Sequence, residues 1–292
     1  MKEITVLSGK GGAGKTTFAA ALASVAQNAV FCDNDVDAAD LHLIFQPQIK
    51  ESHSFSSGNK AEIQSKICTN CGLCAAKCRF DAIHLNTKKQ YKINPFQCEG
   101  CRLCERICPE NAIQVFENTN NSWYVSNTRF GKLIHAKMGP GEENSGKLVT
   151  RIREKAKEIA LDTNADFIIN DGPPGIGCSA ISSVTGTDLV LMVIEPTLSG
   201  LHDAKRLIEL VRNFEIPIFA VINKYDLNPK VSQDVVQYLS ANHITLAGKI
   251  DFDKNVVESI IFEKTIVEFS PNCNFSKEIY YIWNQITEHF SV

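Results

Sequence analysis

The feature that most constrains how this chain can fold is a cysteine pattern, C-x2-C-x2-C-x3-C, which occurs twice. Eight of the eleven cysteines in the 292-residue chain lie between Cys68 and Cys108. The segment IQSKICTNCGLCAAKCRFDAIHL, which begins at Ile63, matches INPFQCEGCRLCERICPENAIQV, which begins at Ile93, cysteine for cysteine. Cysteines in a reducing compartment serve metal binding or catalysis rather than disulfide bonding, so the repeat predicts a small metal-binding domain.

The spacing is that of bacterial ferredoxins, which carry two [4Fe-4S] clusters. In such proteins three cysteines of one motif hold one cluster, and the fourth ligates the other cluster. Zinc is the rival metal, but structural zinc sites usually pair two C-x2-C units across a longer gap, so the spacing favours iron. The resemblance covers about Ala61 to Glu117 and implies two ligand sets, which are Cys68, Cys71, Cys74 and Cys108 for cluster one and Cys98, Cys101, Cys104 and Cys78 for cluster two.

One position distinguishes the two motifs. Pro109 follows the second motif, as in the ferredoxin pattern, whereas Arg79 follows the first. A cation beside a cluster favours the reduced, more negative form and so raises the reduction potential. The alternative is a solvated arginine, and the sequence leaves both readings open.

The N-terminus holds a phosphate-binding motif. The stretch VLSGKGGAGKTT satisfies G-x4-G-K-[ST] between an apolar strand, ITVL, and an alanine-rich helix, TFAAALASVAQ. Glycines let backbone N–H groups converge on phosphate oxygens, while Lys15 neutralises the β- and γ-phosphates and the Thr16 hydroxyl ligates Mg²⁺. The residues expected to bind the nucleotide in this loop are Gly9, Gly11, Gly12, Ala13, Gly14, Lys15, Thr16 and Thr17.

An additional lysine, Lys10, makes this loop resemble the deviant Walker A loop of the MinD/ParA group of ATPases, which includes the nitrogenase iron protein. In that family two subunits face each other across two nucleotides, and this lysine reaches the partner's phosphates. The resemblance therefore implies ATP and Mg²⁺ as cofactors and a homodimer, or a heterodimer with a similar ATPase. The alternative for Lys10 is a solvent-exposed loop lysine.

Acidic residues after two strands match other parts of the same family. Asp35, in FCDNDVDAADLH, corresponds to the switch I carboxylate that positions the attacking water. Asp171, in FIINDGPPGIG, corresponds to the Walker B carboxylate near Mg²⁺, and residues 172–177 to switch II. Asp37 and Asp40 fit capping of the next helix equally well. The resemblance thus implies four catalytic residues, Lys10, Lys15, Asp35 and Asp171.

A further strand end carries the residue expected to bind the base. Asn223 ends the run IFAVIN, where related ATPases read the adenine amino group. Lys224 and Asp226 match the guanine-reading N-K-x-D of GTPases, but the deviant Walker A loop favours ATP. Residues 195–197, with the sequence EPT, either line the same pocket or simply end a strand, and the second interpretation is favoured.

The rest of the chain alternates apolar, β-branched runs with helical segments. This pattern predicts an α/β fold with a mostly parallel, doubly wound P-loop NTPase sheet and an inserted small α+β bacterial-type ferredoxin domain. The expected boundaries are 1–59 and 119–292 for the ATPase domain and 60–118 for the insert. The combination resembles MinD-superfamily ATPases with an inserted ferredoxin domain. GEENSGKLV, residues 141–149, belongs to this resemblance, and Ser145 also fits as a helix cap.

Three cysteines lie outside the repeat. Cys178 follows Asp171 by seven residues, an offset that resembles the cluster-ligating switch II cysteine of the nitrogenase iron protein. No second cysteine outside the insert occupies an obvious partner position, so Cys178 is expected to be a buried core residue. Cys32 and Cys273 are expected to be structural.

The composition limits the cellular compartment and the classes of partner that we expect for this chain. A net charge of -3 with 44% hydrophobic residues gives no overall electrostatic case for nucleic-acid binding. The N-terminal sequence MKEITVLSGK lacks the apolar region of a signal peptide, and no apolar run approaches the length of a membrane span. We therefore expect a cytoplasmic protein without stable membrane insertion.

Three functions remain. The favoured one is an ATP-gated dimer that couples nucleotide state to electron transfer through two [4Fe-4S] clusters, with a redox partner. The second is an ATPase that assembles or delivers a metallocofactor or iron-sulfur cluster to a client protein. The third is a spatial organiser of the MinD/ParA type. Against the third, the C-terminal segment SKEIYYIWNQITEHF carries only Lys277 as a basic residue, whereas a membrane-surface helix carries more cations.

Overall fold

The structure, a computed structural model, describes residues 1–56, 58–139 and 145–291. The chain divides into two compact units. The large unit comprises Met1–Ser52, Trp123–Ala136 and Ser145–Val292, and the small unit comprises His53–Ser122 and Lys137–Asn144. The small unit contains both copies of the cysteine motif.

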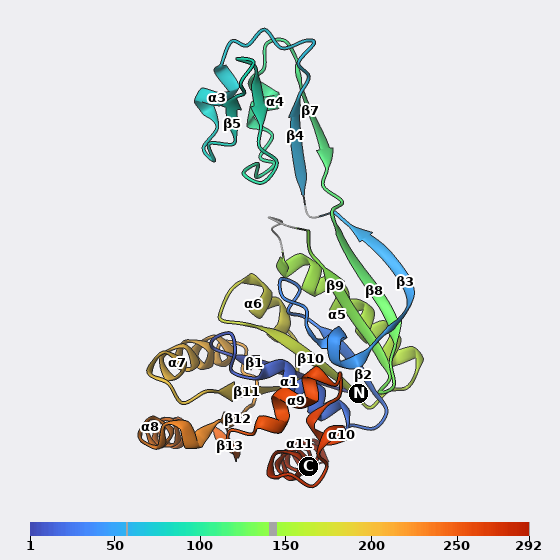
Figure 1. Cartoon of the computed structure of the whole chain (residues 1–292), viewed down its shortest axis with the longest axis vertical. Coiled ribbons are helices and arrows are strands. Elements are labelled where there is room, and N and C mark those ends of the chain that lie inside the picture. The colour runs from blue at the N-terminus through green and yellow to red at the C-terminus, as the bar shows by residue number, and fades with distance from the viewer. Residues whose placement is uncertain (57, 140–144, 292) are drawn as a thin grey trace. The chain divides into compact units, whose positions relative to one another are not determined.

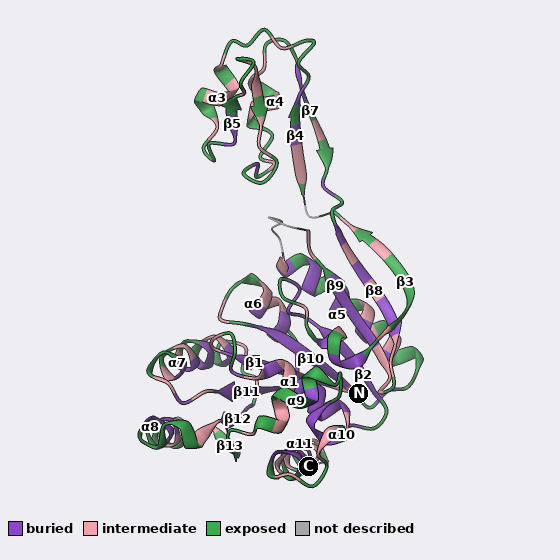
Figure 2. Cartoon of the chain, in the orientation of Figure 1, coloured by how far each residue is buried: buried purple, intermediate pink, exposed green. Residues whose placement is uncertain are grey.

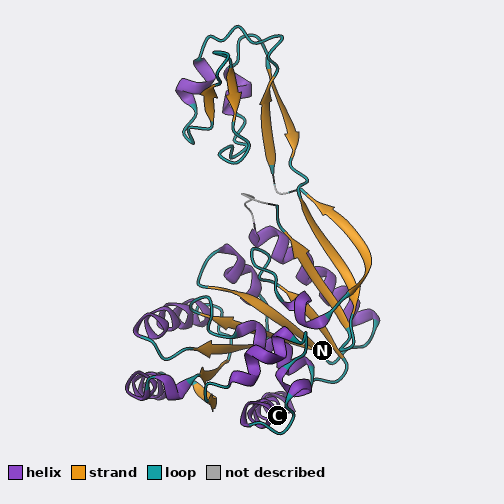
Figure 3. Ribbon diagram, in the orientation of Figure 1, coloured by secondary structure: helices purple, strands orange, loops and turns teal. Residues whose placement is uncertain are grey.

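A mostly parallel sheet forms the centre of the large unit (Figures 1 and 3). Among the described residues its strand order is β13-β12-β11-β1-β10-β2-β9-β8-β3, and the pairs from β13 to β9 are parallel. This order confirms the predicted α/β class with a mostly parallel sheet. The strands are β1 (Lys2–Ser8), β2 (Ala29–Asp33), β3 (Gln48–Phe55), β8 (Asn121–Asn127), β9 (Lys132–Lys137), β10 (Phe167–Pro174), β11 (Leu189–Ile194), β12 (Ile218–Asn223) and β13 (Thr245–Ile250).

Both faces of this sheet are covered by helices, which explains the continuous apolar strands. Along β11, Leu191 packs into one apolar cluster and the next residue, Met192, into another. Figure 2 shows the central strands buried. The helices of the large unit are α1 (Lys15–Ala23), α2 (Leu41–Phe45), α5 (Ser145–Asp162), α6 (Cys178–Val184), α7 (Leu198–Arg212), the 3-10 turn η1 (Tyr225–Leu227), α8 (Pro229–Ala241), α9 (Lys254–Ile261), α10 (Ile266–Phe269) and α11 (Asn274–Ser291).

The C-terminal helix α11 turns its apolar residues into the core. The buried side chains on this face include Ile279, Ile282, Trp283 and Ile286. A helix whose apolar stripe is buried in this way stabilises the sheet rather than offering that stripe to another surface. Within the described ranges, no helix has the length and apolar character needed to cross a membrane.

The edge of the sheet extends further than the sequence pattern indicates. The pattern of strands and helices is interrupted at the polar segment KESHSFSSGNK, yet β3 includes the first part of this segment, up to Phe55, and pairs with β8. Strand β8 in turn is joined to β9 by a tight turn closed between Thr128 and Gly131. Strand β3 is largely exposed, so it has no apolar alternation by which to recognise it, and its charged residues are typical of a protected sheet edge.

The small unit is built as two equivalent halves. Helices α3 (Leu73–Lys77) and α4 (Leu103–Ile107) are each the start of the helical turn within one cysteine motif. Strand β4 (Asn59–Ile63) pairs antiparallel with β7 (Ile113–Glu117), and β5 (Ile83–Leu85) pairs antiparallel with β6 (Tyr91–Ile93). The strand before each motif therefore pairs with the strand after the other motif, as the sequence repeat requires.

The core of the small unit is limited. Its buried apolar cluster consists of Ala61, Ile63, Ala82, Ile83, Cys98 and Ile113. Most of the cysteines of the repeat pack against this cluster as partly buried residues. The sulfur atoms thus occupy the place that larger aliphatic side chains hold in an ordinary domain core.

Candidate functional sites

The glycine-rich loop connects β1 to α1 at the edge where the parallel strands end. Gly12 and Gly14 have φ values of 79° and 103°, which glycine adopts without strain. A Cβ atom at Gly9 would lie 2.5 Å from the backbone of Asp203, so this position has room only for glycine. Gly14 caps α1 without a side-chain hydrogen bond, which leaves backbone N–H groups of the first turn available for an anion.

Lys15 and the acidic loop after β2 face each other. The Lys15 ammonium lies 3.5 Å from a carboxylate oxygen of Asp35, and both residues are buried. Asp33 accepts hydrogen bonds from the backbone N–H groups of Asp35 and Leu41, at 3.2 and 3.1 Å, and so fixes the course of this loop. Asp40 precedes α2 but makes no side-chain capping bond, so Asp33 performs the capping suggested for Asp40. Burial raises the pKa of Asp37.

Asp171 is a buried carboxylate without a hydrogen-bond partner. It lies in β10 beside Val6 of β1 and Asp33 of β2. Neither of its carboxylate oxygens accepts a hydrogen bond from any described residue. Burial raises the pKa of Asp171 to about 7, although the Lys15 ammonium acts to lower it. A buried carboxylate needs a compensating cation, and Mg²⁺ prefers oxygen ligands, so Asp171 together with the Thr16 hydroxyl suits a magnesium ion.

A cavity of about 180 Å³ lies beside the glycine-rich loop. Asn223, the residue expected to read adenine, lines this cavity, and its amide nitrogen donates to the carbonyl of Ala13 at 2.8 Å. The Asn223 side chain also fills the space that a Cβ at Gly14 would need. Several lining residues were not predicted, although they follow the end of β13 at the same sheet edge as Asn223, namely Asp251, Phe252, Asp253, Val256 and Val257.

Lys10 has partners within its own chain. Its ammonium lies 2.6 Å from a carboxylate oxygen of Glu195 and donates to the Thr197 hydroxyl at 3.0 Å. Lys224 holds the other oxygen of Glu195 at 2.9 Å and donates to the Gly12 carbonyl at 3.2 Å. Burial acts to raise the pKa of Glu195, but the two ammonium groups hold it below its ordinary value. Residues 195–197 therefore contact the site, although they were expected to be only a strand end.

Asp226, which matches the guanine-reading position, has a local role. Its carboxylate accepts a hydrogen bond from the backbone N–H of Phe252 at 2.7 Å. This bond ties the segment after β12 to the segment after β13, so Asp226 helps to shape the cavity wall.

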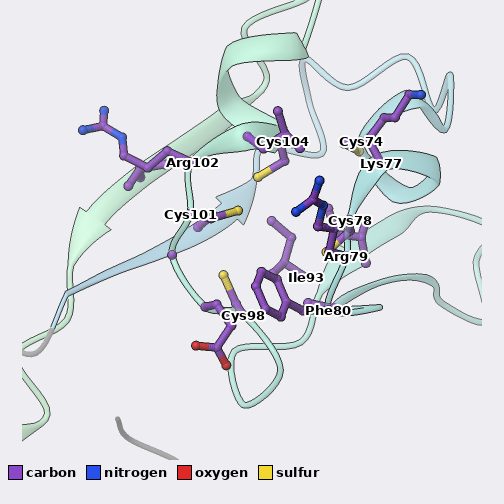
Figure 4. Close-up of a pocket in the computed structure, with 17 residues that line it drawn as sticks. Cys74, Lys77, Cys78, Arg79, Phe80, Ile93, Cys98, Cys101, Arg102 and Cys104 are labelled. Carbon is purple, nitrogen blue, oxygen red and sulfur yellow. The ribbon is translucent and has the colours of Figure 1, made fainter. Parts of the chain in front are cut away.

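The larger cavity of the small unit has a volume of about 270 Å³ (Figure 4). Its walls include Cys98, Cys101 and Cys104 from the second motif and Cys78 from the first. Figure 4 shows these side chains around one space, with Arg79 and Phe80 beside them. Burial raises the pKa of the Cys104 thiol to about 11. The four cysteines of the predicted second ligand set thus surround one cavity.

The smaller cavity, of about 20 Å³, lies at the first motif. It is lined by Cys68, Cys71 and Cys74 together with Cys108 from the second motif. Cys74 lines both cavities. Across the described ranges, no group of three or more histidine, cysteine, aspartate or glutamate residues forms a site for a single metal ion.

The cysteines outside the repeat are separate from these cavities. Cys178 is exposed at the start of α6, so the prediction of a buried core cysteine was wrong. The helix begins directly after the glycine-rich segment that follows β10, and this places its first residues at the surface. Cys32 is buried and Cys273 partly buried, and their sulfur atoms contact Asn34 and Ser276. Residues 141–144 of GEENSGKLV lie outside the described residues, and α5 begins at Ser145.

Comparison with known proteins identifies relatives of the large unit's fold and of the whole chain. A family model described as the CobQ/CobB/MinD/ParA nucleotide binding domain matches residues 4–266. An uncharacterized protein of Methanocaldococcus jannaschii is 36% identical over 277 residues, which cover 90% of this chain and 95% of that protein. An iron-sulfur cluster carrier protein of Aquifex aeolicus is 27% identical over 126 residues, covering 39% of this chain and 35% of that protein.

Two solved structures have the same fold. The septum site-determining protein MinD of Pyrococcus horikoshii, in complex with Mg-ADP, has a TM-score of 0.58 at 17% identity and covers 98% of this chain and 95% of its own. The MinC:MinD cell division complex of Aquifex aeolicus has a TM-score of 0.57 at 19% identity and covers 99% and 96%.

Proposed function

The chain belongs to the CobQ/CobB/MinD/ParA family of nucleotide-binding proteins and is an ATPase of the MinD/ParA type, and from this premise we propose an iron-sulfur function for it. In this proposal an ATP-gated dimer couples nucleotide state to electron transfer through two [4Fe-4S] clusters. The large unit binds and hydrolyses ATP, and the small unit is an inserted bacterial-type ferredoxin domain.

The observation that carries the proposal is the sorting of eight cysteines into two sets. The smaller cavity takes Cys68, Cys71 and Cys74 from the first motif and the last cysteine, Cys108, from the second. The larger cavity takes Cys98, Cys101 and Cys104 from the second motif and the last cysteine, Cys78, from the first, and Cys74 lines both cavities. This crossed arrangement is the ligand pattern of two-cluster ferredoxins. A disulfide framework or a set of unrelated structural cysteines would not require each fourth cysteine to cross to the other cavity.

The donor set suits a cluster better than a single ion. A tetrahedral zinc site with Zn–S bonds of about 2.3 Å needs its sulfur atoms roughly 4 Å apart. A [4Fe-4S] cluster would instead take one thiolate at each of its four iron atoms, which places the thiolates farther apart. The larger cavity, of about 270 Å³, has the four cysteines of one predicted set in its lining and has room for such a group, whereas the smaller cavity measures about 20 Å³. When bound, the clusters supply one-electron redox centres.

In the large unit, Lys15 and Asp35 form a buried ion pair, and each of the two has its own role in the proposed ATP hydrolysis. ATP phosphates bound by the loop attract Lys15, because its ammonium begins beside them at the start of α1. Asp35 then loses its cation and is able to orient the attacking water. Asp171 and Thr16 would hold Mg²⁺, which would supply positive charge beside the phosphates.

Lys10 is the residue that links ATP hydrolysis to formation of the dimer. In the chain described here its ammonium is paired with Glu195, so reaching a partner's phosphates requires that pair to open. Basal ATP hydrolysis should therefore be slow until a homodimer, or a heterodimer with a similar ATPase, forms.

The connectivity of the chain provides a way for nucleotide binding in the large unit to affect the clusters of the small unit. The acidic loop after β2 leads through α2 into β3, and the same strand continues toward the small unit. A rearrangement of this loop on ATP binding would act on the attachment of the small unit. Coupling of binding energies is reciprocal, so cluster reduction should alter ATP affinity by the same free energy by which ATP alters the cluster's reduction potential.

A second function, assembly or delivery of a cluster to a client protein, is supported by the similarity to an iron-sulfur cluster carrier protein over 39% of this chain. Complete ligation by eight cysteines favours a resident electron carrier over a labile donor. The two functions differ in whether iron leaves the protein, so single-turnover transfer to an apo-protein distinguishes them. A purely spatial organiser would have no use for the two cysteine-lined cavities.

The iron assignment is tested by metal analysis of anaerobically purified protein. We expect about eight iron and eight sulfide atoms per chain and the spectroscopic signature of two cubanes. The Cys98→Ala variant should lose one cluster and still bind ATP, because Cys98 belongs to the small unit. Stoichiometric zinc in place of iron would overturn the assignment.

The ATPase assignment is tested by separating affinity from turnover. Lys15→Ala should lose nucleotide binding, since the removed charge faces the phosphates, whereas Asp35→Ala should keep binding and lose hydrolysis. Equal loss of binding in both variants would exclude a water-orienting role for Asp35. Redox titrations with and without ATP, paired with ATP affinity in both oxidation states, test the coupling.

A further inference from the structure

The two halves of the small unit differ in charge at equivalent positions. Lys77, Arg79 and Phe80, at the larger cavity, correspond in the repeat to Ile107, Pro109 and Glu110. The smaller cavity is lined by Pro109 and Glu110. Two cations and an aromatic ring of the first motif are thus replaced in the second by two apolar side chains and an acid, and of these Pro109 and Glu110 line the smaller cavity.

The cations at the larger cavity are available for an external partner. Lys77 and Arg79 are exposed, and neither forms an ion pair with any residue in the described ranges. Arg102, a third cation of the same wall, is already held by Glu105 through two hydrogen bonds of 2.8 and 3.1 Å. The same wall carries one carboxylate, that of Glu99, against the three cations Lys77, Arg79 and Arg102. The lining of this cavity therefore has a net positive charge, although the chain as a whole carries -3.

Apolar surface accompanies this charge. The Phe80 side chain is 44% exposed and Leu103 is 39% exposed, and both line the larger cavity. Figure 4 shows Phe80 and Arg79 beside Cys78 and Cys98, so the aromatic ring and the guanidinium lie directly next to the cysteines. An exposed aromatic ring with an arginine beside it is the composition of a transient protein interface rather than of an inert surface.

We infer that Lys77, Arg79 and Phe80, here called the cationic rim, form the docking surface for an acidic electron-carrier protein, and that cluster two is the cluster that exchanges electrons with it. The inference rests on the proposed iron-sulfur function. Charge complementarity identifies the partner class, because a positive rim steers an acidic protein to the opening and disfavours a basic one. One electron passes between the reduced centre of one protein and the oxidised centre of the other, with no bond made or broken.

The same cations set the direction of electron flow within the small unit. Positive charge beside a cluster stabilises its reduced form, which is the more negative one. Arg79 lines the larger cavity, whereas its counterpart Pro109 lines the smaller one. Cluster two should therefore have the higher reduction potential, and an electron that enters at cluster one settles at cluster two, next to the rim.

The test compares two charge-reversal variants of the full chain. Lys77→Glu with Arg79→Glu reverses two rim charges, and Lys66→Glu with Arg106→Glu is the matched control, since Lys66 and Arg106 are exposed cations of the same unit that line neither cavity. Stopped-flow mixing of the reduced protein with an oxidised acidic flavodoxin measures the second-order rate of electron transfer. The rim variant should react about tenfold more slowly at low salt and lose most of its dependence on ionic strength, while the control keeps both.

A second readout excludes a merely structural effect. Redox titration followed by electron paramagnetic resonance should show that Arg79→Gln lowers the potential of one cluster and leaves the other unchanged, while iron content stays at the wild-type value. Equal flavodoxin rates in the rim variant and the control would overturn the docking surface, as would faster transfer to a basic cytochrome c than to flavodoxin. Loss of wild-type self-association in the rim variant, with flavodoxin rates unchanged, would assign the rim to a second copy of the chain and also overturn it. Absence of iron from the wild-type protein would instead overturn the proposed function itself.

Discussion

The two units of this chain obtain their cores by different means. In the large unit, apolar side chains cover both faces of the sheet, with residues such as Phe18 and Ile282 on one face and Leu207 and Val235 on the other. In the small unit the buried cluster contains six residues, one of them a cysteine. The large unit thus has the apolar burial that a domain needs, whereas cysteine side chains pack around the small apolar core of the other unit.

This difference shows where the stability of each unit comes from. Domains below roughly 70–80 residues seldom obtain enough stability from apolar burial alone and use disulfides or metals in addition. The cysteines of the small unit form no disulfide within the described residues, and they line two cavities. Metal binding would then be part of the folding free energy of the small unit, and the large unit would fold without it.

The largest effect that would test this comparison is removal of iron. Treating the protein with an iron chelator should unfold the small unit while the large unit keeps its cooperative thermal transition and its ATP affinity. Amide hydrogen exchange distinguishes the two units. Protection of the backbone amides should vanish in residues 59–117 and persist in β1, β10 and β11. Retention of protection throughout the small unit after complete loss of iron would show that its apolar cluster suffices.

A large effect confined to the other unit is expected from Arg153. Its guanidinium donates to Glu3 at 2.7 Å and to the Thr185 carbonyl at 2.8 Å, and Glu3 is buried. Arg153→Met should lower the free energy of unfolding of the large unit by about 3 kcal/mol, because a buried carboxylate loses a partner. Chemical denaturation measures this loss.

The matched control for Arg153 is on the same helix. Lys155→Met removes an ion pair between Lys155 and Glu158 at the helix surface, where solvent screens the charges. This variant should change the unfolding transition little, and iron content should stay constant in both variants. A similar loss of unfolding free energy in the two variants would show that the buried contacts of Arg153 stabilise the unit no more than the surface ion pair does.

A pH-dependent effect should also be limited to the large unit. Burial, with a contribution from His42, lowers the pKa of His135 from 6.5 to about 4. The unfolded chain then binds a proton more readily than the folded one between these values, so stability falls as the pH decreases from 6.5 toward 4. The expected loss is about 2 kcal/mol at pH 5. His135→Phe should remove this part of the pH dependence, as measured by denaturation at pH 7 and pH 5, and an unchanged slope would contradict the assignment.

The smallest effect concerns a single contact in the small unit. Lys60 on β4 donates to the carbonyl of Cys98 at 3.1 Å, which ties the strand to the second cysteine loop. Lys60→Met should cost about 1 kcal/mol in that loop and speed iron release to a chelator roughly fivefold. Lys66→Met, at an exposed position, is the control. Equal release rates would show that the loop is held by its cysteines alone.

Much of the site could be predicted because its signals are local. The glycine-rich loop, Asp35 and Asp171 each come at the end of an apolar run in the sequence, and parallel strands end at one edge of the sheet, so the side chains meet there. The α/β class was predictable for the same reason, since each buried strand is a continuous apolar run. Their roles with ATP stay predictions until the variants above are measured.

The ferredoxin-type spacing predicted that the fourth cysteine of each motif crosses to the other ligand set. In the structure Cys78 lines the larger cavity and Cys108 the smaller one, and their role as cluster ligands stays a prediction. Other features depended on packing between segments far apart in sequence, which no local pattern encodes. These features are the pairing of Lys10 with Glu195, the wall formed by residues 251–253 and the edge strand β3. Arg79 shows what the sequence left undecided. Its position allowed either a cation beside a cluster or a solvated side chain. The tertiary structure places Arg79 in the wall of the larger cavity, because the neighbouring Cys78 lines that cavity.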